Sequence, residues 1–391
     1  MTEQLKLKLN DSKATRWGAL VIVAFTMMAA YYVNDVVAPL KTMLETDLAW
    51  SSTDFGFFTG GYSFLNVFFL MLIWGGLILD RFGIRFTGKL ATILMVGGTA
   101  LEYYAMTGLA GADATLFGIN EIFGYKTGVF VAFAGYSIFG VGAEVAGITV
   151  SKIIAKWFKG KDLATAMGVQ VALARIVSQA GYAVAIPLAR AFGISTPVLL
   201  GLVLLLGGMI AFFIFAVMDK KLDKQMEAAA IAAGTEDEEE KFSFKDVKNI
   251  LVNPGFWLIA LLCVLFYSCV FPFQKFASEL MIIKYGINEN VAGTFAGLPA
   301  LGALILTPVF GGFIDKRGKS ASIMLLGSAM LICVHFIYAI PDINYWLVAI
   351  VLMIILGIAF SLVPSAMWPA VAKIFPVSQL GTAYALIFFI Q

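Results

Sequence analysis

Two ionisable residues, Glu144 and Arg175, lie deep within long apolar stretches of this sequence of 391 residues. A guanidinium binds a carboxylate through two parallel hydrogen bonds, and a carboxylate or an aromatic ring face binds an ammonium group. The two residues therefore suit a small solute that carries both charges. The alternative is a structural ion pair between two segments, and we favour the binding site because a buried ion pair is a poor source of stability.

Further polar residues are spaced so that they can belong to the same site. Arg175, Gln179 and Tyr182 follow the i, i+4, i+7 rule and share one face of a helix. The ammonium group has several candidate partners, which are Glu144, Asp35, Tyr31 and Tyr267.

The composition indicates the kind of element that must hold these residues. The chain is 60% hydrophobic and 13% charged, with a mean hydropathy of +0.90. This leaves too little polar surface to cover a water-soluble globule. We therefore predict an integral, multi-pass membrane protein that has the lipid bilayer as its surroundings.

A membrane helix needs roughly 20 mostly apolar residues to cross about 30 Å of hydrocarbon. This length predicts ten spans, near residues 17–40, 55–79, 87–109, 127–153, 163–189, 196–218, 255–276, 291–314, 320–340 and 345–371. The stretch from Ser378 to Gln391 is the first half of an eleventh span, so we expect the natural protein to continue. The fold class is thus all-α.

The predicted organisation has four parts. These are an N-terminus at 1–16, a six-helix bundle at 17–218, an acidic linker at 219–253 and an incomplete second bundle at 254–391. We interpret the linker, with its run GTEDEEEK, as a solvated tether, because it lacks the ligand spacing of a calcium site.

Lys and Arg are concentrated on one side of the predicted spans, which places the N-terminus and the linker in the cytoplasm. Glu144 and Arg175 then lie about 14 and 20 Å from the cytoplasmic ends of their helices. At these depths the two side chains can meet near the middle of the bilayer. The lean outer loops favour a bacterial inner membrane.

Other classes of chemistry have little support. The three cysteines lie in apolar runs without CxxC spacing, so no metal site is predicted. There is no nucleophile with a base and no phosphate-binding glycine loop, so we expect neither an enzyme nor a nucleotide, nucleic-acid or cofactor partner. Glu102 is expected to reach water near the outer face, and His335 is expected to be a packing residue.

A short motif occurs in both halves of the chain. The first copy consists of Gly76, Asp80, Arg81, Gly83 and Arg85, and the second contains Asp315 and Lys316 after the eighth span. A second repeat pairs Ala155-Lys156-Trp157-Phe158 with Ala372-Lys373-Ile374-Phe375. The halves are therefore copies of one helical unit.

The first motif resembles the signature between spans two and three of the major facilitator superfamily. The resemblance covers the whole chain and implies two pseudo-symmetric six-helix bundles, with alternating access to a central site. It implies that the motif gates the transporter. Gly76 and Gly83 would permit close helix approach and a tight turn, and Asp80 would accept hydrogen bonds from amides at the start of span eleven. The alternative is that the charges only fix the topology.

Within this family, several stretches resemble the lysosomal dipeptide transporter branch and its bacterial relatives. They are Trp157-Phe158-Lys159-Gly160-Lys161, Phe271-Pro272-Phe273 and Leu380-Gly381-Thr382-Ala383-Tyr384. The resemblance puts the substrate-binding Glu and Arg of the branch at Glu144 and Arg175. The polar cluster of its first span is only loosely matched by residues 31–35, with Pro39 displaced.

Three functions remain open at this stage. The first is transport of small peptides, and the second is a proton-coupled carrier of an organic anion or another metabolite. The third is a membrane scaffold or receptor that does not transport and does not need Glu144 or Arg175. The sequence leaves the need for an accessory subunit undecided.

Overall fold

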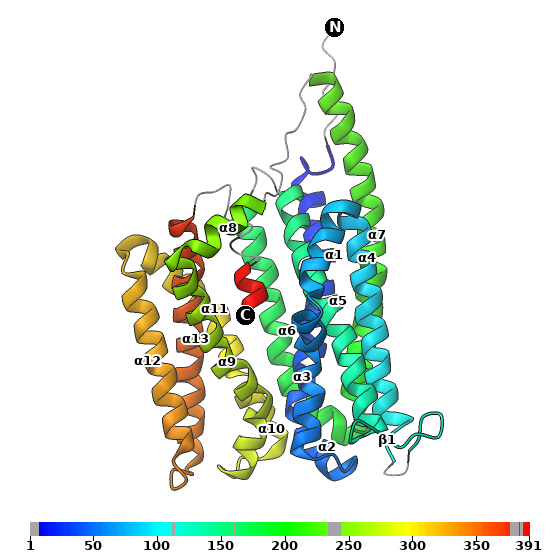
Figure 1. Ribbon diagram of the computed structural model, residues 1–391, viewed down its shortest axis with the longest axis vertical. Helices are drawn as coiled ribbons and strands as arrows, with labels where there is room; N and C mark the ends of the chain where they lie inside the picture. Colours follow the sequence, from blue (N-terminus) through cyan, green and yellow to red (C-terminus); the bar gives the residue numbers. More distant parts are fainter. Residues whose placement is uncertain (1–7, 112–113, 159–161, 234–243, 376–382, 384–385) are drawn as a thin grey trace. The chain divides into compact units, whose positions relative to one another are not determined.

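The computed structural model of the chain describes residues 8–111, 114–158, 162–233, 244–375, 383 and 386–391 (Figure 1). Its helices are α1 (Lys13–Val36), η1 (Ala38–Leu40), α2 (Lys41–Asp47), α3 (Ser52–Phe68), α4 (Met71–Thr107), α5 (Thr127–Trp157), α6 (Leu163–Phe192), α7 (Thr196–Ala233), α8 (Phe244–Val252), α9 (Pro254–Ile283), α10 (Glu289–Ala296), α11 (Leu298–Arg317), α12 (Ser320–Ala339) and α13 (Trp346–Ile374). One hairpin joins α4 to α5 through β1 (Glu121–Ile122) and β2 (Tyr125–Lys126). The all-α prediction is confirmed.

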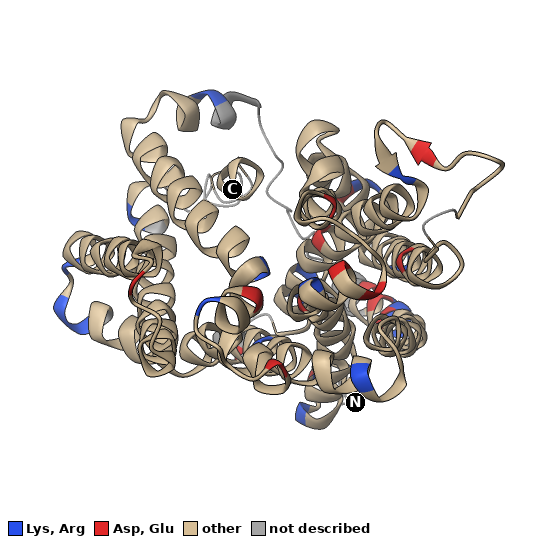
Figure 2. Ribbon diagram, turned by 90° about the horizontal axis from the view of Figure 1, so that it is seen from below, with Lys and Arg blue, Asp and Glu red and all other residues tan. Residues whose placement is uncertain are grey.

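The helices have the length that a membrane requires. Among the described residues, eight are long and apolar enough to cross a bilayer, and the bent pair of α3 and α4 raises the count to nine. The backbone of α4 breaks at Gly83, so this pair covers the two spans that we predict at 55–79 and 87–109. Most of the helical ribbon carries no charge (Figure 2).

Gly83 makes the turn that the sequence predicts for it. Its φ is 75° and its ψ is 172°, a conformation that residues with a Cβ rarely adopt. Gly318 follows α11 with a φ of 69°. Each glycine stands three residues after the Asp of its motif copy, at Asp80 and Asp315. The repeat in the sequence therefore has a counterpart in the backbone.

The linker contains more helix than the sequence predicts. Helix α7 continues from the predicted span through residues 219–233. Those residues are rich in Ala and Lys, which favour helix once a preceding span has nucleated it. The acidic run at 234–241 lies outside the described residues.

The described chain divides into two compact units. Unit 1 consists of Met1–Asn34, Met43–Val177 and Phe192–Glu238, and unit 2 consists of Asp35–Thr42, Ser178–Ala191 and Glu239–Gln391. The end of α1 and the second half of α6 thus belong to the same unit as α9 and α10. Whether the biological domains end at residues 218 and 254 stays a prediction.

Unit 1 is held together by close contacts between α3, α4 and α5. A Cβ on Gly98 would lie 2.4 Å from the backbone nitrogen of Phe139 and 2.5 Å from the carbonyl oxygen of Gly135. A Cβ on Gly61 would lie 2.7 Å from the carbonyl oxygen of Phe133. Small residues therefore let these helices approach closely, as is typical of packing inside membranes.

In unit 2, α13 packs against both α11 and α12. A Cβ on Gly302 of α11 would lie 2.9 Å from the Cα of Gly357 of α13, so the two backbones nearly touch. Phe266 of α9 stacks on Phe360 of α13 with ring centroids 6.1 Å apart. The core of unit 2 is therefore apolar and largely aromatic where α9 meets α13.

Candidate functional site

Glu144 of α5 is hydrogen-bonded to a tyrosine that the sequence analysis did not single out. The Tyr62 hydroxyl of α3 donates to the Glu144 Oε1 atom at 2.7 Å. Gly140, one turn before Glu144, makes this contact possible, because a Cβ there would lie 2.2 Å from the Tyr62 carbonyl oxygen. Both side chains are half-buried. In the described residues, the carboxylate is thus held by a neutral donor rather than by Arg175.

A second tyrosine extends this polar cluster towards α1. The ring of Tyr136 lies 5.7 Å from that of Tyr62. Its hydroxyl donates to the backbone oxygen of Asn34 at 2.9 Å and lies 3.0 Å from the Asn34 Oδ1 atom. Tyr136 is fully buried. It therefore fixes the end of α1 against α5 beside the Tyr62 and Glu144 pair.

Arg175 lies on the part of α6 that belongs to unit 1. Its guanidinium carbon is 5.6 Å from the centre of the Tyr31 ring of α1, a cation–π contact. Unit 1 therefore contains three predicted binding residues, Glu144, Arg175 and Tyr31. In this unit, the Glu144 carboxylate contacts Tyr62 and the Arg175 guanidinium contacts Tyr31.

Asp35 belongs to unit 2 and has polar neighbours there. The Ser178 hydroxyl donates to its carboxylate, and the Lys275 ammonium of α9 lies 4.0 Å from the Oδ1 atom. The Asp35 side chain is 13% exposed. This carboxylate is thus already next to a cation of the protein.

Gln179 and Tyr182 pack against α9 and α10 in unit 2. The Gln179 Nε2 atom donates to the Thr294 carbonyl oxygen at 3.0 Å, and the Tyr182 hydroxyl lies 3.4 Å from the Gln274 carbonyl oxygen. A Cβ on Gly293 would lie 2.1 Å from the Tyr182 carbonyl oxygen. These two residues therefore connect the second half of α6 to the helices of the later half of the chain.

Two ion pairs strengthen the same part of unit 2. The Lys41 ammonium, which is 1% exposed, pairs with Glu279 of α9. Arg190 of α6 pairs with Glu289 at the start of α10. The Lys41 pair is buried, and removing one partner of a buried pair leaves an uncompensated charge, which is strongly destabilising. These contacts fasten residues 35–42 and 178–191 to α9 and α10.

Tyr267 is buried among aromatic rings of α9 and α13. Its ring stacks on Phe271 with centroids 5.1 Å apart, and Phe360 lies edge-on at 6.3 Å. The predicted role of Tyr267 in binding an ammonium group stays a prediction.

The first motif begins with an exposed ion pair. Lys152 of α5 donates to the Asp80 carboxylate at 2.8 Å. Residues 376–382, which include the predicted partner amides at the start of span eleven, lie outside the described residues. Arg81 lies over the ring of its neighbour Phe82.

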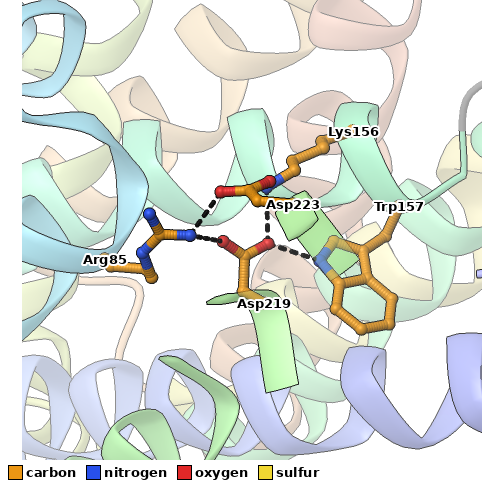
Figure 3. A network of polar contacts seen from close by, with 5 residues as sticks. All are labelled: Arg85, Lys156, Trp157, Asp219 and Asp223. Atoms are coloured by element: carbon orange, nitrogen blue, oxygen red, sulfur yellow. Dashed lines mark hydrogen bonds and ion pairs between the residues drawn. The ribbon is translucent and has the colours of Figure 1, made fainter. Parts of the chain in front are cut away.

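The Arg at the end of the motif belongs to a network that joins α4, α5 and α7 (Figure 3). Arg85 donates to Asp219 at 3.1 Å and also to Asp223. Lys156 donates to the same two carboxylates, and the Trp157 Nε1 atom donates to Asp219 at 3.0 Å. Asp219 is fully buried. Arg85 therefore joins three helices of unit 1.

The close helix approach that the sequence predicts at Gly76 is not found at that residue. A Cβ on Gly76 would meet no atom within 4 Å. The close approach predicted there is found at Gly75, where a Cβ would lie 2.5 Å from the Val145 side chain. In the second copy, Asp315 and Lys316 lie in the last turn of α11, and the Lys316 side chain is exposed.

Two other ionisable residues lie within spans. The expectation that Glu102 reaches water is wrong, because its side chain is fully buried where α4 packs closely against α5. The ring of His335 lies edge-on to Phe273, with centroids 4.9 Å apart.

Sequence reasoning missed Tyr62, Tyr136, Lys152 and Asp219. Tyr62 and Tyr136 are aromatic residues in apolar spans, where tyrosine is common, so their type alone gives no signal. Asp219 directly follows the apolar run of α7, so its place at the end of the predicted span was an available signal.

The comparison with family models decides the family. The model of the Major Facilitator Superfamily matches residues 20–391. The chain belongs to the Major Facilitator Superfamily.

Curated relatives of this superfamily member cover from two thirds to nearly all of its length. The lysosomal dipeptide transporter MFSD1 of Homo sapiens is 28% identical, with 97% of this chain and 77% of that protein covered. The protein of the same name from Gallus gallus is 32% identical, with 66% and 58% covered.

Solved structures show the same superfamily fold. A D-xylose-proton symporter matches with a TM-score of 0.63 and 16% identity, covering 96% of this chain and 87% of that one. A bacterial homolog of the human lysosomal transporter Spinster matches with a TM-score of 0.64 and 15% identity, covering 97% and 79%. The family match and the curated relatives show that the chain is a multi-pass membrane protein and a secondary transporter of a small solute.

Proposed function

We propose that this transporter carries dipeptides across the membrane by alternating access. The relatives that support this substrate are named as dipeptide transporters. The observation that carries the proposal is the contact of Tyr62 with Glu144 at 2.7 Å. It leaves the carboxylate with a neutral partner, so the negative charge remains to be compensated by a cationic group of the substrate.

The chemistry of a zwitterion matches the two charges of unit 1. The planar guanidinium of Arg175 suits the substrate carboxylate, because it can donate two parallel hydrogen bonds. Glu144 suits the substrate ammonium better than Asp35 does, since Asp35 already lies 4.0 Å from the Lys275 ammonium. We assign Arg175 to the carboxylate and Glu144 to the ammonium, with Tyr31 and Tyr62 as their orienting neighbours.

The residues of unit 2 have a different role in this proposal. Gln179 and Tyr182 hold α6 against α9 and α10 through backbone oxygens. They act together with Asp35 as parts that must rearrange when the transporter changes state.

The test is substrate-dependent stabilisation of the purified full chain. The thermal unfolding midpoint is measured with dipeptides, amino acids, tripeptides, sugars and carboxylic acids, because binding to the folded state raises this midpoint. The wild type is compared with Arg175→Ala, and with Arg190→Ala, whose guanidinium pairs with Glu289.

A midpoint shift with dipeptides that is lost in Arg175→Ala and kept in Arg190→Ala supports the assignment. A shift with carboxylic acids alone favours the organic-anion carrier. If none of the solutes shifts the midpoint and uptake into proteoliposomes is absent, a scaffold or receptor is favoured and the dipeptide proposal fails.

We also infer a bacterial inner membrane with a cytoplasmic N-terminus. The basic residues at one end of unit 1, among them Arg85, Lys152 and Lys156, support this orientation. A cysteine placed at Ser12 should react with a thiol reagent only after the reagent gains access to the cytoplasm. Reaction in intact cells with an impermeant reagent would contradict the orientation.

A further inference from the structure

A groove with basic walls lies between α4 and α7 in unit 1. It has a volume of about 540 Å³ and is lined by Arg85, Lys89, Ala216, Val217 and Lys220. Arg85 and Lys89 are one helical turn apart on α4, and Lys220 is one turn after Ala216 on α7. The groove is thus formed by one face of each helix.

The two helices are in contact beside this groove. A Cβ on Gly88 would lie 1.9 Å from the Phe212 ring, so α7 packs directly on the α4 backbone. The Lys89 ammonium lies 5.4 Å from the centre of the Phe213 ring. The base of the groove is therefore formed by closely packed residues of α4 and α7.

The charges of the groove do not cancel. Arg85 and Lys156 are balanced by the carboxylates of Asp219 and Asp223. Lys89 and Lys220 make no ion pair within the described part of the chain, and both side chains are exposed. The groove therefore carries two uncompensated positive charges next to a neutral network.

Arg85 adds donors to the same groove. Both of its ion pairs use the Nη1 atom, and the other terminal nitrogen points away from the two carboxylates (Figure 3). A guanidinium has five N–H donors in a fixed fork. The unused donors can bind the oxygens of an anion.

The groove also has an apolar wall that faces outward. Val217 is 72% exposed, and the apolar run of α7 ends at Met218, directly before Asp219. On α4, Lys89 stands at the start of the apolar run that begins with Leu90. The basic residues therefore lie at the edge of the bilayer, with hydrocarbon beside them.

We propose that this groove binds the phosphate headgroup of an anionic membrane lipid, with its acyl chain along Val217. Two lysines and an arginine complement a phosphodiester, and the apolar wall complements the chain that a free phosphate lacks. Basic pockets between membrane helices bind lipid headgroups for these physical reasons. Because Arg85 also joins α4, α5 and α7, the lipid would contact the network that holds these three helices together.

The test measures lipid binding to the full chain purified in detergent. Native mass spectrometry and thermal unfolding are carried out with phosphatidylglycerol, with phosphatidylcholine of the same acyl chains and with inorganic phosphate. The variants are Lys89→Gln and Lys220→Gln. The matched control is Lys221→Gln, which removes the same charge from the next position of α7, about 100° around the helix.

We expect phosphatidylglycerol to bind and to raise the unfolding midpoint, while phosphatidylcholine and inorganic phosphate have little effect. Each groove lysine contributes about 1 kcal/mol to headgroup attraction. Each Lys→Gln change should therefore weaken binding about fivefold, and Lys221→Gln should leave it unchanged.

A further variant tests the apolar wall. Val217→Trp fills the groove and keeps both lysines, so it should abolish lipid binding. Equal binding of phosphatidylglycerol and phosphatidylcholine would overturn the proposal, as would equal losses in Lys220→Gln and Lys221→Gln. A response to inorganic phosphate as strong as to lipid would also overturn it, because the site would then bind a soluble anion.

Discussion

Asp219 and Glu144 are both acidic residues of unit 1, and their surroundings differ in kind. Asp219 is fully buried and accepts hydrogen bonds from Arg85, Lys156 and Trp157. Glu144 is half-buried and is hydrogen-bonded to the neutral hydroxyl of Tyr62. One carboxylate is compensated by cations of the protein, and the other is held in place without compensation.

This difference separates a structural charge from a functional one. A buried carboxylate with several charged donors stabilises the helices that supply them, and it has no capacity left for a ligand. A carboxylate with one neutral donor carries a cost of burial that a cationic ligand can offset. Loss of Asp219 should therefore lower the stability of the fold, and loss of Glu144 should weaken substrate binding.

The largest effect is expected from Asp219→Asn. The amide keeps the shape and an acceptor for Trp157, but it leaves the charges of Arg85 and Lys156 with Asp223 alone. Breaking a buried charge network of this kind costs about 3 kcal/mol of unfolding free energy. Chemical unfolding in detergent measures this loss.

The matched control for Asp219→Asn is Asp223→Asn. Asp223 is 41% exposed, so its loss should cost about 1 kcal/mol or less. Equal losses from the two substitutions would show that burial does not set the strength of the network.

Glu144→Gln should leave folding nearly unchanged and weaken dipeptide binding about tenfold. The Tyr62 hydroxyl can still donate to the amide oxygen, but the hydrogen bond to the substrate ammonium loses its charge. Isothermal titration or equilibrium dialysis with a dipeptide measures the affinity. Glu121→Gln, in the hairpin before α5, is the control. Unchanged selectivity and transport rate in Glu144→Gln would refute the role of this residue.

Tyr62→Phe should lower the unfolding free energy by about 1 kcal/mol, because the half-buried carboxylate loses its donor. The effect should shrink in the Glu144→Gln background, since the two groups interact directly. A double-mutant cycle measures this coupling. Additive effects of the two substitutions would show that the hydrogen bond at 2.7 Å contributes nothing.

Lys152→Gln should have the smallest effect on stability, about 0.5 kcal/mol, because its pair with Asp80 is exposed. The loss should decrease further as salt is added. Unfolding measured at two ionic strengths tests this. A salt-independent loss as large as that of Asp219→Asn would make Lys152 part of a buried network.

Much of the fold could be predicted from the sequence because each step depends on local information. Runs of about 20 apolar residues predict the spans, and Gly83 predicts the turn that its φ of 75° confirms. The polar, charged composition after Met218 predicts a solvated tether. The structure instead has a helix there, because the same residues favour helix.

The candidate site was predicted only in part, for a physical reason. Depth along a helix places Glu144 and Arg175 within the membrane, but the partner of each depends on the packing of neighbouring helices. The Tyr62 contact requires the close approach of α3 at Gly140, and the network of Asp219 requires residues of α4, α5 and α7 to meet.

The sequence by itself determined the membrane class, the repeated halves, the position of the spans and the two charges that suit a zwitterion. Only the tertiary structure decided that Glu144 binds Tyr62, that Arg85 joins α4 to α7, and that Lys89 and Lys220 line one groove. Hydrophobicity and helix periodicity are properties of consecutive residues. Pairing between distant residues is set by the distance and rotation of packed helices, which no single segment contains.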